Sequence, residues 1–316
     1  MEALIKPLII VLVIAVILVI VWKIFAGTKR DKKNYARALK MVPMMIHLPP
    51  STDDVQVNGR DERDVIGEQI SEAQVMYSII SSTLTKGLKT RFYGQKHISF
   101  EIVAHDGFIK YYATVPAVLT ETVKQAITAA YPTARLEEVK DPNFFSEEGK
   151  IDAIAGGELT FKEDYWYPIA SYEDTKRDAS LGLINALSTA KKGDGIAVQI
   201  MFRPTDGGWV KNSLERVQNI KDGKKSKKAA NFLGRMVNGA GNLVGDVAEA
   251  LWKPPEEHEK WKAEDKVLTN LQQEEIQRIE EKTKYPGFET LIRIISSSST
   301  KARSEAVLSS VVSVFS

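Results

Sequence analysis

The stretch that decides the fold reads ISFEIVAHDGFIKYYATV, residues 98–115. Apolar residues recur at every second position up to Asp106-Gly107, a dipeptide typical of a tight hairpin turn, and alternation resumes beyond it. We therefore expect two antiparallel strands, at 98–104 and 108–115. The turn gives Asp106 a structural role, so the His105-Asp106 pair is a poor candidate for proton transfer.

Helical patterns flank this hairpin on both sides. Apolar residues recur every three or four positions over 66–84 and again over 118–130. Shorter strand-like segments lie outside these helices, at 42–48 and 134–139. The order βαββαβ over about 100 residues predicts a split-βαβ, ferredoxin-like domain at residues 42–142.

Residues 150–316 repeat the beginning of this pattern. Strands are expected at 151–161, 196–202 and 288–295, and helices at 178–191 and 300–314. A closing strand is missing, so the second unit either differs from the first or belongs to a truncated polypeptide, and we favour truncation. The predicted fold class is α+β: an N-terminal transmembrane helix followed by two ferredoxin-like (βαββαβ) units, the second truncated and carrying a helical-hairpin insertion.

The insertion covers residues 205–287. It begins with a polar segment, continues with a basic cluster, and then shows apolar residues at helical spacing over 229–252. We expect this amphipathic helix to pack against the charged helix that follows it, or else to lie on an anionic membrane surface or a partner. The residues expected at a membrane-surface or partner contact are Lys224, Lys225, Lys227, Lys228, Phe232, Leu233, Met236 and Trp252.

The N-terminus carries the apolar run LIIVLVIAVILVIVW, from Leu8 to Trp22. About 20 helical residues cross a bilayer, so residues 1–27 are predicted to form a transmembrane anchor, with Leu8, Val16 and Trp22 among its membrane-facing residues. A cleaved signal peptide is the alternative. It is disfavoured because the chain has no basic cluster before the apolar run and continues without a small-residue cleavage site.

Basic residues dominate the segment after the apolar run. Residues 1–50 carry eight Lys or Arg against two Asp or Glu, a net charge of +6, and most of the positive charge lies in the basic juxtamembrane linker expected at 28–41. The positive-inside rule then predicts a single-pass protein of the inner (cytoplasmic) membrane, with its N-terminus outside and its body in the cytoplasm. The main role expected for the linker is to determine the topology, and an additional role is contact with anionic lipid headgroups.

The composition of the remaining chain excludes several classes of protein. The last 266 residues carry 35 Lys or Arg and 39 Asp or Glu, a net charge of −4, which argues against a general nucleic-acid binder. There is no cysteine, so disulfides, thiolate metal sites and cysteine nucleophiles are excluded. Hydrophobic content of 43% and charged content of 27% are typical of globular material.

Motifs that carry catalysis are missing from the sequence. No Walker A, H-E-x-x-H or G-x-S-x-G pattern occurs, and the glycine-rich segment 239–245 has the wrong spacing for a dinucleotide fingerprint. Glu137 and Glu138 are neighbours on an expected strand and point to opposite faces. The aromatic run 165–167 is more typical of packing at a domain edge than of a stacking surface. We therefore predict that this chain is not an enzyme and that it has no catalytic, cofactor-binding or metal-binding residue.

Three runs resemble a bacterial family: PPSTDDVQVN (49–58), ISFEIVAHDGFIKYY (98–112) with Pro116, and AYPTA (130–134). They are similar to the N-terminal membrane-anchored regions that precede the motor in type IV secretion and conjugation-like ATPases, the coupling-protein or DNA-translocase class. The resemblance covers mainly residues 42–142 and, more loosely, the rest of the chain to residue 316. It implies that nucleotide hydrolysis belongs to a RecA-like domain further along, whose Walker motifs this chain lacks.

These features favour a non-catalytic, membrane-tethered cytoplasmic platform or assembly region of such an ATPase. The alternative is a membrane-surface or partner-binding scaffold module that uses the amphipathic helix 229–252, and an enzyme of unknown type is the third reading. The expected partners are the lipid bilayer and a secretion-system ATPase domain or its oligomer. Nucleic acid is not expected to bind this segment.

Overall fold

The computed structural model describes residues 2–48, 62–140, 153–170, 179–223 and 268–315, with the side chains of 2–16, 62–69, 91 and 179 left out. The chain divides into two compact units. The first contains Met1–Thr160, Tyr172–Asp206 and Pro286–Ser316, and the second contains Phe161–Ser171 and Gly207–Tyr285. The second unit nearly coincides with the insertion expected at 205–287.

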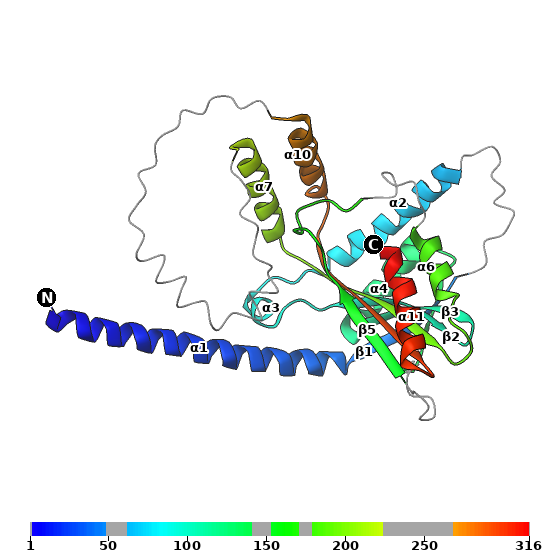
Figure 1. The fold of residues 1–316 in the computed structure, drawn as a ribbon, viewed down its shortest axis with the longest axis horizontal. Helices are drawn as coiled ribbons and strands as arrows, with labels where there is room; N and C mark the ends of the chain where they lie inside the picture. Colours follow the sequence, from blue (N-terminus) through cyan, green and yellow to red (C-terminus); the bar gives the residue numbers. More distant parts are fainter. Residues whose placement is uncertain (1, 49–61, 141–152, 171–178, 224–267, 316) are drawn as a thin grey trace. The chain divides into compact units, whose positions relative to one another are not determined.

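The first unit is built on an antiparallel sheet (Figure 1). Its described strands number seven and follow the order β4-β1-β3-β2-β6-β7-β5. The strands are β1 (Met41–His47), β2 (Ile98–His105), β3 (Phe108–Pro116), β4 (Arg135–Glu138), β5 (Ala153–Leu159), β6 (Gly195–Pro204) and β7 (Phe288–Ser298). Strands from residues 42–142 and from residues 150–316 therefore belong to a single sheet, joined where β2 pairs with β6.

The central hairpin forms as the sequence predicts. His105 pairs with Phe108 across a two-residue turn, and Asp106 and Gly107 adopt φ values of 50° and 82°. Both residues lie in the left-handed region, which Asp tolerates and Gly adopts freely, so the backbone of the turn matches the twist of the two strands.

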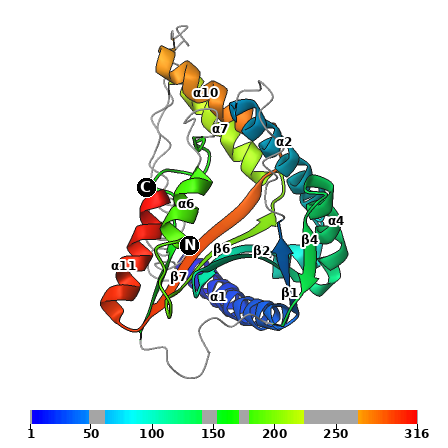
Figure 2. The ribbon, with the colours of Figure 1, turned by 90° about the vertical axis from the view of Figure 1, so that its right-hand side faces the viewer.

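Two pairs of helices pack on the sheet. In the half formed by β4, β1, β3 and β2, helices α2 (Glu62–Ser81) and α4 (Thr120–Ala130) lie side by side, and α4 follows the short 3₁₀ helix η1 (Ala117–Leu119) (Figure 2). In the other half, α6 (Ala179–Leu187) lies beside α11 (Lys301–Val312), which continues into η2 (Ser313–Phe315). These four helices fit the sequence prediction to within a few residues at most ends.

One face of the sheet provides a core for both pairs of helices. The even-numbered residues of β2 point to this face: Ile98 packs with Met44, Ile80 and Val123 in one cluster, whereas Ala104 packs in the other. The second cluster contains Leu187, Ile196, Val198, Ile294, Val307 and Val311. Ile200 contacts both clusters, so the two cores are continuous.

Aromatic rings reinforce the junction between the two halves of the sheet. Phe202 of β6 is only 3% exposed, and its ring centroid lies 5.7 Å from that of Tyr77, 5.2 Å from that of Phe100 and 5.6 Å from that of Phe288. The contacts with Tyr77 and Phe288 are edge-to-face and the contact with Phe100 is tilted, and aromatic pairs at these distances add to the energy of burial.

The second unit contains two packed helices, α7 (Gly208–Lys221) and α10 (Asn270–Lys282). Val217 and Ile220 of α7 are buried against Ile276 and Ile279 of α10. From the sequence, the segment that forms α7 was expected only to be polar. The helix was missed although its buried residues, Ser213, Val217 and Ile220, follow the three- and four-residue spacing of a helix face.

The helix expected at 229–252 lies outside the described residues, so its packing stays a prediction. Within the described part, the apolar face of α10 packs on α7. Helix α10 begins at a capping box: the Gln272 N–H donates to Thr269 Oγ1 at 3.3 Å, and the Thr269 N–H donates to Gln272 Oε1 at 3.0 Å. This arrangement satisfies backbone donors that the first turn leaves free.

The N-terminal helix α1 runs from Glu2 to Ala38 without a break. Residues 28–38 of the expected juxtamembrane linker are therefore helical. In the part of the chain that the structure describes, no helix combines the length and the apolar character that a membrane span requires. The transmembrane helix expected at residues 1–27 stays a prediction.

Candidate functional site: helix α1 and the segment docked on it

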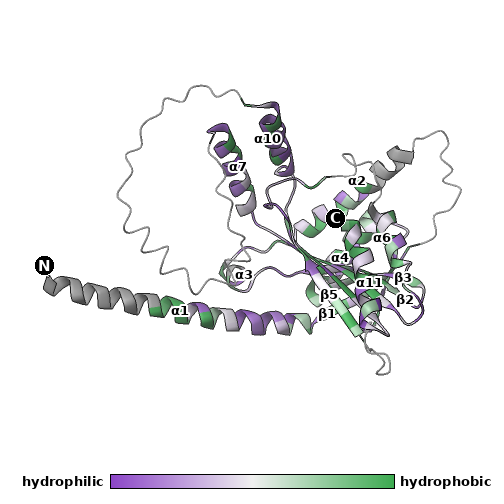
Figure 3. Ribbon diagram, viewed as in Figure 1, coloured by the Kyte–Doolittle hydropathy of each residue, from purple (hydrophilic) through white to green (hydrophobic). Residues whose placement is uncertain are grey.

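A band of exposed apolar side chains occupies the middle of α1. Its members are each 48–65% exposed: Ile17, Leu18, Val19, Ile20, Val21, Trp22, Ile24 and Phe25. Figure 3 shows this apolar stretch of α1 followed by a hydrophilic one. Single exposed apolar residues are common, but eight within nine positions of one helix mark an interaction surface.

The expected anchor residues all lie on this helix. Trp22 belongs to the exposed band, at 62% exposure. Leu8 and Val16 precede the band on the same helix, and their side chains lie outside the described part of the structure. The expected contact residues Lys224, Lys225, Lys227, Lys228, Phe232, Leu233, Met236 and Trp252 lie outside the described residues, so their contacts stay a prediction.

The apolar band changes into a basic segment within two turns of helix. Lys29 Nζ lies 5.4 Å from the centroid of the Phe25 ring, so the first cation of the segment covers the last ring of the band. The cations of this segment are Lys29, Arg30, Lys32, Lys33, Arg37 and Lys40, and Asp31 is its one acidic residue.

A short helix, α3 (Leu88–Tyr93), docks on the same region of α1. The ring centroids of Trp22 and Phe92 lie 6.4 Å apart in an edge-to-face arrangement. Further along α1, Arg37 Nη1 donates hydrogen bonds to the carbonyl oxygens of Tyr93 at 3.0 Å and Gly94 at 3.2 Å. The segment after α2 is thereby fixed beside the basic part of α1.

Helix α3 and its contacts were not predicted from the sequence. The available signal in the sequence was weak, because it consists only of two glycines, Gly87 and Gly94, on either side of six residues. In the structure, both glycines adopt positive φ values, 140° and 75°. Nothing in the spacing of the sequence connects Arg37 with Tyr93, because the contact depends on how the chain folds back after α2.

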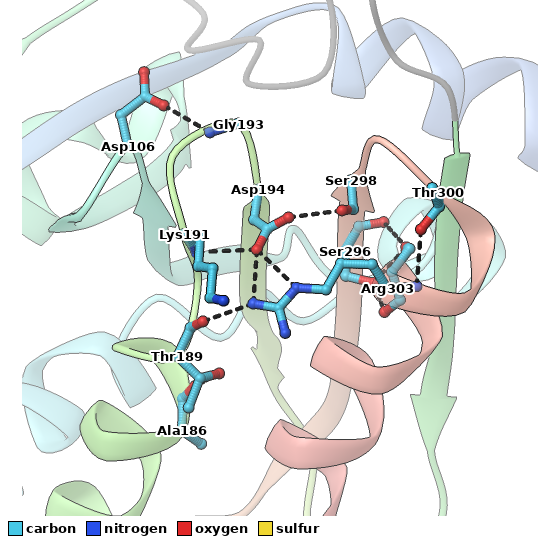
Figure 4. Close-up of polar contacts among 11 residues, drawn as sticks. Asp106, Ala186, Thr189, Lys191, Gly193, Asp194, Ser296, Ser298, Thr300 and Arg303 are labelled. Atoms are coloured by element: carbon cyan, nitrogen blue, oxygen red, sulfur yellow. Dashed lines mark hydrogen bonds and ion pairs between the residues drawn. The ribbon is translucent and has the colours of Figure 1, made fainter.

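A polar centre separate from α1 surrounds the buried carboxylate of Asp194, directly before β6 (Figure 4). Asp194 Oδ2 accepts from the Lys191 N–H at 3.0 Å and from Arg303 Nε and Nη2 at 3.1 and 2.9 Å, and Oδ1 accepts from Ser298 Oγ at 2.6 Å. Arg303 Nη2 also donates to the Thr189 carbonyl at 2.9 Å.

The Asp194 side chain is only 7% exposed, so its environment decides its ionisation. Burial opposes the charged form, but the hydrogen bonds from Ser298, the Lys191 N–H and Arg303, together with the charge of Arg303, lower its pKa below the ordinary value. Both oxygens are engaged by these donors. The centre therefore ties α11 to the start of β6 and has the character of a structural pair.

The neighbouring turn has the same structural character. Asp106 Oδ1 accepts from the Gly193 N–H at 3.2 Å, which links the turn of the β2–β3 hairpin to the loop before β6 (Figure 4). His105 Nδ1 lies 3.6 Å from Asp106 Oδ2, longer than a hydrogen bond. These contacts agree with the structural role that the sequence assigned to Asp106.

The two adjacent glutamates of β4 were expected to point to opposite faces of the sheet. Glu137 pairs with His47 at 3.1 Å, whereas Glu138 pairs with Lys124 at 2.7 Å, as expected if the two glutamates point to opposite faces of β4.

The aromatic run 165–167 packs within the second unit. Trp166 packs against that unit's core, and Lys282 Nζ donates to the carbonyl oxygens of Tyr165 and Tyr167 at 2.6 and 3.0 Å. Burial there lowers the pKa of Lys282. The packing interpretation of this run is confirmed.

The fold and the site define an α+β protein with one seven-stranded antiparallel sheet and an N-terminal helix that exposes an apolar band. The chain matches a family model over residues 47–316 and belongs to that family, described as a domain of unknown function (DUF8128). No curated protein and no solved structure matches it. The match begins at the last residue of β1, so α1 precedes the matched region.

Proposed function

We propose that the chain is a membrane-tethered, non-catalytic platform, anchored through α1. The observation that carries this proposal is the exposed apolar band at residues 17–25. Burying one large apolar side chain is worth about 1.5–3 kcal/mol, so leaving eight of them in water is costly. Insertion of α1 into a bilayer removes that cost and uses the apolar residues from Leu8 onward as well.

The charges beside the band support an orientation. Lys29, Arg30, Lys32 and Lys33 follow the apolar residues directly, and Trp22 lies where interfacial aromatic residues are typical. In this proposal, the N-terminus faces outward and the body lies at the cytoplasmic face of the inner membrane. A tether of this kind raises the local concentration of the body near its partners.

We also propose that each half of the sheet is a ferredoxin-like unit. The order β4-β1-β3-β2 with α2 and α4 is what a βαββαβ unit requires. The order β6-β7-β5 with α6 and α11 repeats it without a fourth strand beside β5. Among the described strands, β5 pairs with β7 alone, and its other edge is the position that a fourth strand takes in a ferredoxin-like unit.

The proposed place of this platform is at the base of a type IV secretion or conjugation-like ATPase. Its support is the similarity of the runs at 49–58, 98–112 and 130–134 to the regions that precede such motors. The intact mass of the native polypeptide, extracted from membranes, tests this part. A mass well above 35.2 kDa is expected if a motor follows in the same chain, and a mass near that value contradicts it.

Membrane attachment has a direct test on the full chain. We expect wild-type protein to remain in the membrane pellet after an alkaline carbonate wash, and the double variant Leu18→Asp, Val21→Asp to be released, because two carboxylates in the band oppose insertion. The matched control is Leu181→Asp, Leu271→Asp, which changes two exposed leucines that do not belong to α1 and should leave the chain in the pellet. Release of the wild-type chain by carbonate would overturn the proposal.

A further inference from the structure

Three guanidinium groups gather around the backbone of Gly94. Arg37 Nη1 donates to the Gly94 carbonyl oxygen at 3.2 Å. A Cβ atom placed on Gly94 would lie 3.1 Å from Arg203 Nη1 and 3.4 Å from Arg30 Nη2. Arg30 and Arg37 come from α1 and Arg203 from β6, so elements far apart in sequence build this cationic cluster.

The positive charge of the cluster is only partly balanced. Arg203 Nε donates to Glu289 Oε2, and Arg203 Nη2 forms an ion pair with the same oxygen, which leaves Nη1 toward Gly94. Among the described residues, neither Arg30 nor Arg37 forms an ion pair. The pKa of the nearby His97 is lowered by burial and by the positive charges of Arg203 and Arg37. Holding like charges together is unfavourable unless an anion offsets them.

The segment beside the cluster carries the features of a membrane interface. Residues 82–97 contain Lys86, Lys89, Arg91 and Lys96 and no acidic residue. Leu88 at the start of α3 is 86% exposed, and Phe92 contacts Trp22 of the apolar band. An apolar surface and a cationic surface therefore meet where α3 docks on α1.

We propose that Arg30, Arg37 and Arg203 around Gly94 bind the phosphate group of an anionic lipid, an inference that rests on the proposed membrane attachment. Guanidinium groups bind phosphate oxygens through paired N–H donors, and these charge-assisted hydrogen bonds are stronger than neutral ones. The absence of a side chain at Gly94 lets the guanidinium groups of Arg30 and Arg203 approach its backbone closely. The acyl chains would follow the apolar band of α1, which a soluble phosphate could not use.

The test is native mass spectrometry of the full chain in a neutral detergent, offered equal amounts of phosphatidylglycerol and phosphatidylcholine. We expect wild-type protein to retain phosphatidylglycerol preferentially. Arg30→Gln should lower the ratio of the two retained lipids about fivefold, since one basic residue near an anionic surface is worth about 1 kcal/mol. Arg30→Lys keeps the charge and should recover part of the ratio.

Lys32→Gln is the matched control, because it removes one positive charge from the same helix outside the cluster. An unchanged ratio in this variant supports a defined site, whereas a loss equal to that of Arg30→Gln overturns it in favour of diffuse attraction. Displacement of phosphatidylglycerol by an equal concentration of inorganic phosphate would overturn the lipid as the ligand. If the chain resists carbonate but shows no lipid preference, only the proposed lipid site is overturned. If carbonate releases the chain, the proposed membrane attachment is overturned as well.

Discussion

Replacing Arg303 by methionine should destabilise the half of the sheet that carries α11. The substitution removes two of the four hydrogen bonds to Asp194 and leaves a carboxylate that is 7% exposed without its countercharge. Breaking a fully buried pair in this way costs about 3–5 kcal/mol. The Arg303 side chain is itself 35% exposed, so water can approach the vacated position, and we expect about 2–3 kcal/mol.

The assay is urea unfolding of the full chain in detergent, followed by circular dichroism, with hydrogen exchange of the peptides from β7 and α11 as the local readout. Arg293→Met is the matched control, because Arg293 forms an ion pair of 2.7 Å with Glu158 in which both side chains are 40–46% exposed. An exposed pair of this kind contributes at most about 1 kcal/mol. Equal destabilisation by the two variants would refute the role assigned to the Asp194 centre.

The same centre predicts how stability depends on pH. The pKa of Asp194 is lowered in the folded protein, so the unfolded chain binds its proton more readily. The contribution is fully present above the ordinary aspartate pKa of about 3.9 and is lost as the pH falls through the lower folded value. Arg303→Met should flatten this acid dependence, as well as lower the stability at neutral pH.

Three further substitutions test other parts of the fold. Phe202→Ala should cost about 3–5 kcal/mol in urea unfolding, because it empties a site that is 3% exposed and contacts three aromatic rings, whereas exposed Phe161→Ala should cost little. Thr269→Ala removes the capping box of α10 and should cost about 0.5–2 kcal/mol, seen as faster hydrogen exchange in α10 while β2 and β3 are unchanged. Gly107→Ala places a Cβ at φ 82° and should cost about 1 kcal/mol in urea unfolding; a neutral result would contradict the turn geometry.

Local patterns in the sequence predict most elements of this fold. The alternation on either side of Asp106-Gly107 predicts the β2–β3 hairpin, and the spacing of apolar residues predicts α2, α4, α6 and α11. These elements are predictable because the buried face of a strand or helix is formed by residues that are close together in sequence. Helix α7 was missed although its spacing is present, since polar residues dominate the segment. Helix α3 has only six residues and no repeat long enough to detect.

Contacts between distant segments could not be predicted in the same way. The pairing of β2 with β6, which joins the two halves of the sheet, depends on residues about a hundred positions apart. The Asp194–Arg303 pair and the Arg37–Gly94 contact are likewise products of the assembled fold. Of the candidate site, the sequence therefore reveals the apolar and basic parts of α1 but not the segment that docks on them.

The join between the two halves also builds the cationic cluster. Ile98 pairs with Phe202, so the next residue outward on each strand, His97 and Arg203, come together at the end of β2 that leads back to Gly94. A slip of one residue in this register would turn Arg203 to the other face of the sheet and Phe202 out of the core. The buried ring of Phe202 therefore fixes the register that brings the third guanidinium to Gly94. The sheet core and the proposed lipid site depend on the same strand pairing, so a change that loosens Phe202 should weaken retention of phosphatidylglycerol as well as stability.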